Sequence, residues 1–193
     1  MGFFNKGKRK KQEKHVFVLL HLNARLQPVH RKEFFEEVLE EIISKYKLGR
    51  FTGGGTLQSA IGEIVSCDVE MMIRKDKVQQ FLDLLYEIDN IPKGSIVIVG
   101  NEKKEIGFAE GLALYLNGTD LAPEIYENCD INYLIELLEN ALEDLTQGFS
   151  YREEGREIAL YYYGKSYCEI KEKIMPIVES YPLCALCRIE QIA

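Results

Sequence analysis

The sequence lacks any uncharged apolar run of about 18 residues, the length that a membrane-spanning helix needs. We also expect no secretory signal, because Glu13 follows the basic N-terminal residues where a signal would have its apolar core. Cysteine is scarce, with five residues, and an odd number without a signal is typical of reduced thiols in a cytoplasmic protein. A disulfide framework is therefore not expected.

Motifs of known catalytic and metal sites are also absent. The chain contains no Gly-x-Ser-x-Gly, no His-Glu-x-x-His and no Gly-Lys-Ser/Thr loop. The three histidines, His15, His21 and His30, lack the spacing of a metal site or of a nucleophile and its base. Cys184 and Cys187 form a single C-x-x-C, whereas structural zinc normally takes two such pairs. We expect these cysteines to be small buried thiols, and we expect no catalytic residue, no metal and no cofactor.

Basic residues are concentrated in the first 14 residues. That segment carries +5, which leaves −12 for the body from His15 onward out of a total of −7. An acidic body disfavours nucleic acid, because phosphates are bound through Lys and Arg. It favours solubility, or the steering of a basic protein partner. Residues 1–14 are expected to form a flexible tail. The alternative is weak contact with an anionic membrane, because Phe3 and Phe4 lie beside the lysines.

The 46% of apolar residues follow one succession of patterns twice. Two apolar strand patterns, over 15–23 and 107–117, both end in Leu-Asn and precede a proline. The first strand is apolar on both sides, so we expect both of its faces to be covered. The elements predicted after it are a helix over 30–46, strands over 50–60 and 63–73, a helix over 78–88 and a strand over 95–100.

The second half repeats this order. Its pattern predicts a helix over 131–145, a hairpin of 149–152 with 157–163, a helix opening at the capping box Ser166-Tyr-Cys-Glu169, and a strand over 185–192. Two βαββαβ units in tandem resemble two ferredoxin-like modules. The resemblance implies an α+β fold with antiparallel sheets and helices on one face of each, divided into 15–101 and 102–193.

Two sets of residues are candidates for binding. Thr52-Gly-Gly-Gly-Thr56 is one, because the amides of Gly53, Gly54 and Gly55 next to Thr56 can bind an anion or admit the backbone of a partner. A bulged edge strand is the alternative interpretation. The other set lies after the two matching strands, where the candidates are Asn23, Arg25, Asn117 and Asp120. These would converge if the modules packed about a pseudo-twofold axis, whereas as turn formers they would bond their own backbone.

The remaining stretches favour structural roles. Asp68 and Glu70 lie on one strand face. Paired carboxylates can do acid–base chemistry, but such a pair more commonly belongs to a solvated strand face. Tyr161, Tyr162 and Tyr163 alternate across a strand, so we expect core packing with one exposed ring.

We therefore predict a non-catalytic cytoplasmic protein that binds a basic protein partner, as an immunity or inhibitor protein would. The alternative is a regulatory module that binds a small molecule between its two units. An enzyme that uses Arg25, Asp68 and Glu70 is the least favoured interpretation.

Overall fold

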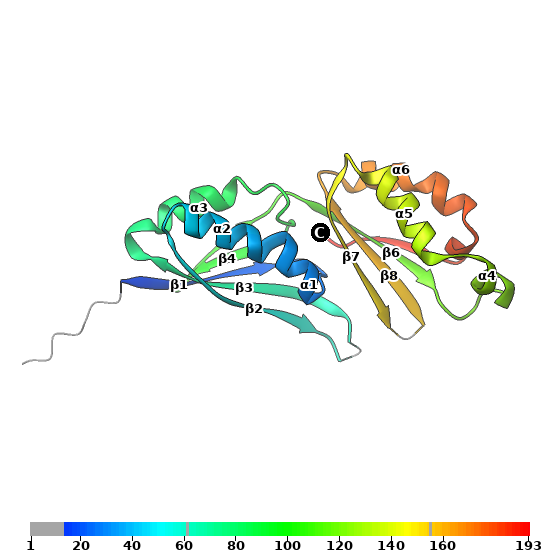
Figure 1. Ribbon diagram of the computed structural model, residues 1–193, viewed down its shortest axis with the longest axis horizontal. Helices are drawn as coiled ribbons and strands as arrows, with labels where there is room; N and C mark the ends of the chain where they lie inside the picture. The colour runs from blue at the N-terminus through cyan, green and yellow to red at the C-terminus, as the bar shows by residue number, and fades with distance from the viewer. Residues whose placement is uncertain (1–13, 61, 155) are drawn as a thin grey trace, which may run out of the picture.

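A computed structural model of the chain describes residues 14–60, 62–154 and 156–193. Two halves, each a sheet with helices, lie side by side along the long axis of the molecule (Figure 1). The expected basic tail lies outside the described residues except for Lys14, as do Ile61 and Gly155 of two expected turns. In the part of the chain that is described, no helix has the length and apolar character needed to cross a membrane.

The first half forms a five-stranded sheet. Its elements are β1 (His15–Leu22), α1 (Pro28–Arg31), η1 (Lys32–Glu36), α2 (Glu37–Lys45), β2 (Gly49–Gln58), β3 (Ile64–Arg74), η2 (Lys75–Lys77), α3 (Val78–Tyr86), β4 (Ser95–Val99) and β5 (Glu102–Ile106). The strand order is β2-β3-β1-β4-β5, and every pair of neighbours is antiparallel. The helix predicted over 30–46 is the continuous helical segment α1–η1–α2, whose middle turn is a π-helix.

The second half forms a four-stranded sheet. Its elements are β6 (Glu110–Asn117), α4 (Pro123–Asn128), α5 (Ile131–Leu142), β7 (Thr146–Glu154), β8 (Glu157–Gly164), α6 (Tyr167–Ser180), η3 (Pro182–Cys184) and β9 (Arg188–Gln191). The order is β7-β8-β6-β9, again antiparallel throughout. The predicted cap of α6 is confirmed, since Ser166 Oγ accepts the N–H of Glu169 at 3.3 Å.

The α+β class with two antiparallel sheets and helices is thus confirmed. Strands β2-β3-β1-β4 and β7-β8-β6-β9 occupy corresponding places in the two sheets. Among the α-helices and strands, α4 and β5 were not expected from the sequence. Strand β5 extends the first sheet beyond residue 101, because Glu102–Ile106 pairs with β4.

The two sheets differ in how their faces are covered. Tyr162 packs with α5 and α6, while Tyr161 and Tyr163 on the other face pack against the first half. All three rings are at most 4% exposed, so the expectation of one exposed ring was wrong. In the first sheet only the face towards α2 and α3 is covered (Figure 1). Phe17 on the opposite face is 45% exposed, so the expectation that both faces of the first strand are covered was wrong within this chain.

Candidate functional site between the two halves

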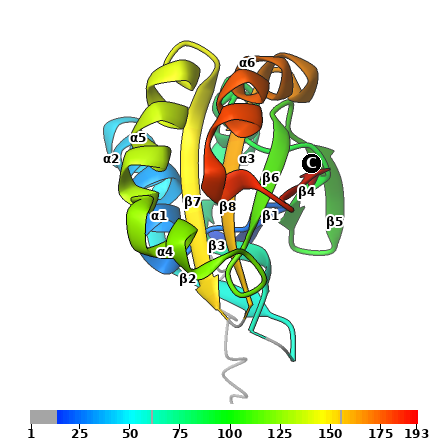
Figure 2. The ribbon, with the colours of Figure 1, turned by 90° about the vertical axis from the view of Figure 1, so that its right-hand side faces the viewer.

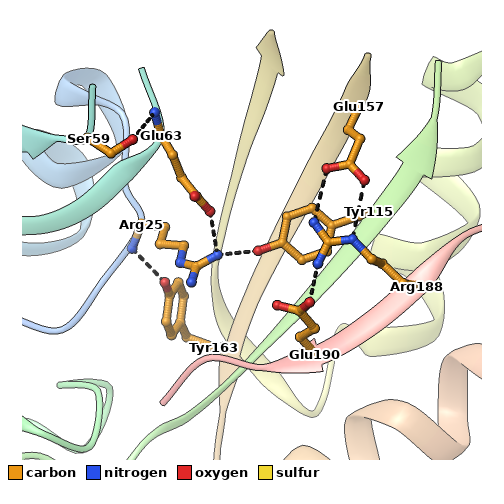
Figure 3. Close-up of polar contacts among 8 residues, drawn as sticks. All are labelled: Arg25, Ser59, Glu63, Tyr115, Glu157, Tyr163, Arg188 and Glu190. Carbon is orange, nitrogen blue, oxygen red and sulfur yellow. Dashed lines mark hydrogen bonds and ion pairs between the residues drawn. The ribbon is translucent and has the colours of Figure 1, made fainter. Parts of the chain in front are cut away.

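Arg25, the first candidate from the sequence, joins the two halves. It lies in the loop after β1, where its Nη1 donates to Glu63 Oε1 at 2.9 Å and to the hydroxyl of Tyr115 (Figure 3). Its backbone N–H donates to the hydroxyl of Tyr163 at 2.7 Å, and its guanidinium lies 5.8 Å from the ring centroid of Tyr161. The guanidinium is therefore engaged by groups of both halves, which makes Arg25 a clamp between them.

A second arginine supports this clamp from the other side of Tyr115. The guanidinium of Arg188 lies 3.5 Å from the centroid of the Tyr115 ring and donates to Glu157 Oε2 at 3.0 Å (Figure 3). It also pairs with Glu190. The hydrogen bond from Arg188 holds the pKa of Glu157 below its usual range. Tyr115 is thus held between two cations, one at its hydroxyl and one over its ring.

The two Leu-Asn turns do not converge. The Nδ2 of Asn23 donates to the carbonyl of Lys93 at 2.8 Å and to that of Ile192 at 3.5 Å. Ile192 bonds the backbone of Gly111 near the start of β6, whereas Asn117 ends that strand. The Oδ1 of Asn117 accepts the N–H groups of Thr119 at 3.0 Å and Asp120 at 2.8 Å. Asn117 and Asp120 therefore form a local turn, which agrees with the alternative interpretation that these residues are turn formers.

The glycine stretch is part of the edge strand β2, with an irregular register between Phe51 and Gly53. Gly54 faces the helical layer, where a Cβ would lie 2.5 Å from Glu36 Oε1 and 2.8 Å from the carbonyl oxygen of Asp68. Arg31 packs over this position, since it donates to Glu36 at 2.7 Å and to the hydroxyl of Thr56. Gly54 and Thr56 thus pack against the helical segment that begins at Pro28.

A cleft of about 380 Å³ opens between the halves. The small-molecule interpretation of the sequence expects a site between the two units, but none of the candidate residues lines this cleft. The first half contributes residues of α1 and η1, and the second half contributes residues of α5, β7 and β8. Its lining residues are His30, Glu33, Phe34, Glu139, Thr146, Gln147, Gly148, Phe149 and Tyr162. Figure 2 shows α1 close to β7, the strand that supplies one wall of the cleft.

Aromatic rings form the floor of this cleft. The ring of His30 stacks on Phe34 with centroids 6.1 Å apart and lies 6.4 Å from Phe149. Phe149 in turn lies 5.2 Å from Tyr162. His30 Nδ1 is 2.9 Å from Ser150 Oγ, within hydrogen-bond distance, so the imidazole has a defined orientation. The result is a set of ring faces contributed by both halves.

The charged residues that line the cleft are acidic. Glu33 and Glu139 are both exposed, and no lysine or arginine is among the lining residues. Burial lowers the pKa of His30, against the opposing effect of Glu33, so the imidazole is neutral at pH 7. The cleft therefore has a negative potential over apolar ring faces.

Tyr162, one of the residues that line the cleft, has a buried hydroxyl without a hydrogen-bond partner in the described chain. Its side chain is 1% exposed. Burial, and next the charge of Glu139, raise the pKa of Tyr162, so the phenol stays protonated at neutral pH. Leaving such a buried hydroxyl unpaired costs about 1–3 kcal/mol of stability.

Comparisons with known proteins identify no family. No family profile matches the chain, and no curated protein sequence is similar to it. Among solved structures it is similar to a proposed glycine cleavage system transcriptional repressor, with 6% identity over 92% of this chain and 96% of that one and a TM-score of 0.31. A proposed monooxygenase from Fusobacterium nucleatum is 10% identical over 93% and 92%, with a TM-score of 0.33. The first two RRM domains of yeast poly(U)-binding protein are 13% identical over 91% and 99%, with a TM-score of 0.25.

Proposed function

We propose that this chain is a non-catalytic binding protein made of two ferredoxin-like modules, and that the cleft between them holds a positively charged group. The matching strand orders β2-β3-β1-β4 and β7-β8-β6-β9 support the modular part of the proposal. The cleft carries the functional part, because ring faces from both halves lie beside Glu33 and Glu139 with no basic residue among them.

This combination suits a cation in two ways. A cation over an aromatic face gains about 0.5–1 kcal/mol at an exposed site and about 2 kcal/mol when desolvated. The two carboxylates add long-range attraction that depends on ionic strength.

A lysine or arginine side chain of a basic protein is the first candidate for this group. The charge of −12 on the body steers such a partner towards the chain, as it would in an immunity or inhibitor protein. A small cationic molecule is the second candidate. It is favoured by the volume of about 380 Å³, which lies in the range of ligand pockets, and by the position of the cleft between two modules.

The residues singled out from the sequence have supporting roles in this proposal. Arg25 and Asn23 hold together the modules whose contact forms the cleft. Gly53 and Gly55 remain candidates for contact with a partner, and Asn117 and Asp120 for a lesser contact at the far end of β6. We also propose a cytoplasmic location, since all five cysteines are unpaired.

The test is binding of defined cations to the full chain. The probes are an arginine- and lysine-rich peptide, a small alkylammonium compound, a small guanidinium compound and a neutral isostere of each small probe. We expect at least one cation to raise the melting temperature and its neutral isostere to have no effect. A probe at 100 times its Kd stabilises by about 2.7 kcal/mol.

A charge-matched pair of variants locates the site. Glu33→Gln with Glu139→Gln removes both carboxylates of the cleft, and Glu124→Gln with Glu127→Gln removes the same charge from exposed positions of α4. We expect the first pair to abolish the response and the second to leave it within about twofold, because α4 does not line the cleft. Equal responses in both pairs, or equal responses to cation and isostere, would contradict the proposal.

A further inference from the structure

The outer face of the first sheet presents apolar side chains that nothing in the described chain covers. The register places them on one face, since Phe17 is opposite Met72 and Leu19 is opposite both Glu70 and Ile98. The apolar members of this outer face are Phe17, Leu19, Leu57, Met72, Ile96 and Ile98. Leu57 is 58% exposed, Phe17 is 45% exposed and the other four are partly exposed. A contiguous apolar surface of this kind marks an interface more often than a solvated face.

The same chain shows what happens to the corresponding face of the other sheet. There Tyr115, Tyr161 and Tyr163 are at most 5% exposed, because the first half packs on them. The outer face of the first sheet is thus the one large sheet face among the described residues that lacks such a cover.

Its size suits a dimer interface. Five strands with a mean length of about eight residues cover about 600 Å² in projection, at about 4.8 Å between strands and 3.3 Å per residue. The relief of the side chains enlarges this area towards the roughly 800 Å² per partner that a stable interface buries.

Charge identifies the occupant. Besides His15 and His21, the outer face carries three basic and three acidic side chains, although the body of the chain carries −12. These are Arg50, Arg74 and Lys103 with Asp68, Glu70 and Glu105. A basic partner would leave the arginines and the lysine opposed by like charge. A second copy of the chain, whose net charge is −7, meets least repulsion at a face whose basic and acidic side chains balance. The basic side chains of one copy can then lie near acidic side chains of the other.

We propose that two copies of this chain associate through the outer faces of their first sheets, packed face to face about a twofold axis. Gly53 and Gly55 contribute to the fit, because they pair with Glu70 and Asp68 and add no side chain to the outer face at these two positions of the edge strand. The space above Gly55 is open, since a Cβ built there meets nothing within 4 Å. The proposal stands independently of the cationic cleft, which lies at the contact between the two halves.

Sedimentation equilibrium of the full chain tests the dimer. We expect a monomer–dimer equilibrium that changes little between low and high salt, because apolar contacts dominate and the face is neutral. Phe17→Glu places a charge among the apolar side chains and should raise the dimer Kd by about tenfold or more. Phe108→Glu is the matched control, since Phe108 is 55% exposed in the link between β5 and β6, outside this face. It should leave the Kd unchanged.

A second variant guards against a folding defect in the first. Gly55→Lys adds a charged side chain where the monomer has open space and where the cross-strand partner is Asp68, so it should weaken the dimer without lowering the urea midpoint of the monomer. A wild-type chain that is monomeric at every concentration overturns the proposal. So does a dimer whose Kd is the same in Phe17→Glu, Gly55→Lys and Phe108→Glu.

Discussion

The hydroxyl of Tyr163 accepts the backbone N–H of Arg25 at 2.7 Å, across the contact between the second sheet and the loop after β1. Tyr163 is 4% exposed, and burial raises its pKa, so the phenol remains neutral and able to accept. Together with the Arg25 side chain, this bond makes the two halves share one buried cluster. We therefore expect them to unfold as a single cooperative unit.

Loss of the Arg25 side chain should destabilise the whole chain. In Arg25→Ala, Glu63 and the hydroxyl of Tyr115 lose a charge-assisted partner in a partly buried place. We expect a decrease of about 2–3 kcal/mol in the free energy of unfolding, measured by urea denaturation. Arg156→Ala, at an exposed position, should change it by no more than about 0.5 kcal/mol. Equal effects of the two variants would show that Arg25 is not a clamp.

Two adjacent glycines should respond oppositely to the same substitution. A Cβ at Gly54 would lie 2.5 Å from Glu36 Oε1 and 2.8 Å from a backbone oxygen, so Gly54→Ala forces α1 and η1 away from β2. We expect it to cost about 1–3 kcal/mol. Gly55→Ala meets nothing within 4 Å and should be neutral or stabilise by up to about 1 kcal/mol. Thermal melts of the two variants compare them directly, and a Gly54→Ala variant as stable as wild type would contradict this packing.

Alkaline pH should unfold the chain through its buried tyrosines. Burial raises the pKa of Tyr161 to about 12, and burial also raises the pKa values of Tyr162 and Tyr163. A raised pKa means that the unfolded chain loses these protons first, near pH 10, while the folded chain keeps them. Stability is therefore complete below about pH 10 and decreases as the pH rises towards 12. Melting temperatures and tyrosinate absorbance should change together over that window, and early ionisation of all eleven tyrosines in a folded chain would exclude it.

Acid pH should weaken cation binding if the cleft is the site. The pKa of His30 is lowered by burial, so its imidazole becomes charged only below the usual value of 6.5. A charged His30 would repel a bound cation from the adjacent rings. We expect affinity to fall once the pH is low enough, below 6.5, to charge this imidazole. His30→Gln should remove that dependence while His15→Gln keeps it, as titrations at several pH values would show. Identical pH profiles in both variants would place the titrating group elsewhere.

Local patterns in the sequence were sufficient for the elements. Helical periodicity located α2, α3, α5 and α6, and alternating or continuously apolar runs located β1, β3, β4 and β8, because each pattern follows from the geometry of one element. The sequence patterns did not predict the short elements β5 and α4. In β5 four of five residues are exposed and charged, so its pairing with β4 left no apolar alternation to detect. The residues that line the cleft lie far apart in sequence, and no spacing connects His30 with Phe149.

The sequence by itself thus determined the α+β class and the order of most helices and strands, since these depend on neighbours a few residues apart. Tertiary structure alone decided which sheet face is covered and what Arg25 contacts. Tyr161 and Phe17 both belong to apolar strands with no difference in pattern between them. One is fully buried and the other is 45% exposed, because only the second sheet has the other half of the chain packed against it.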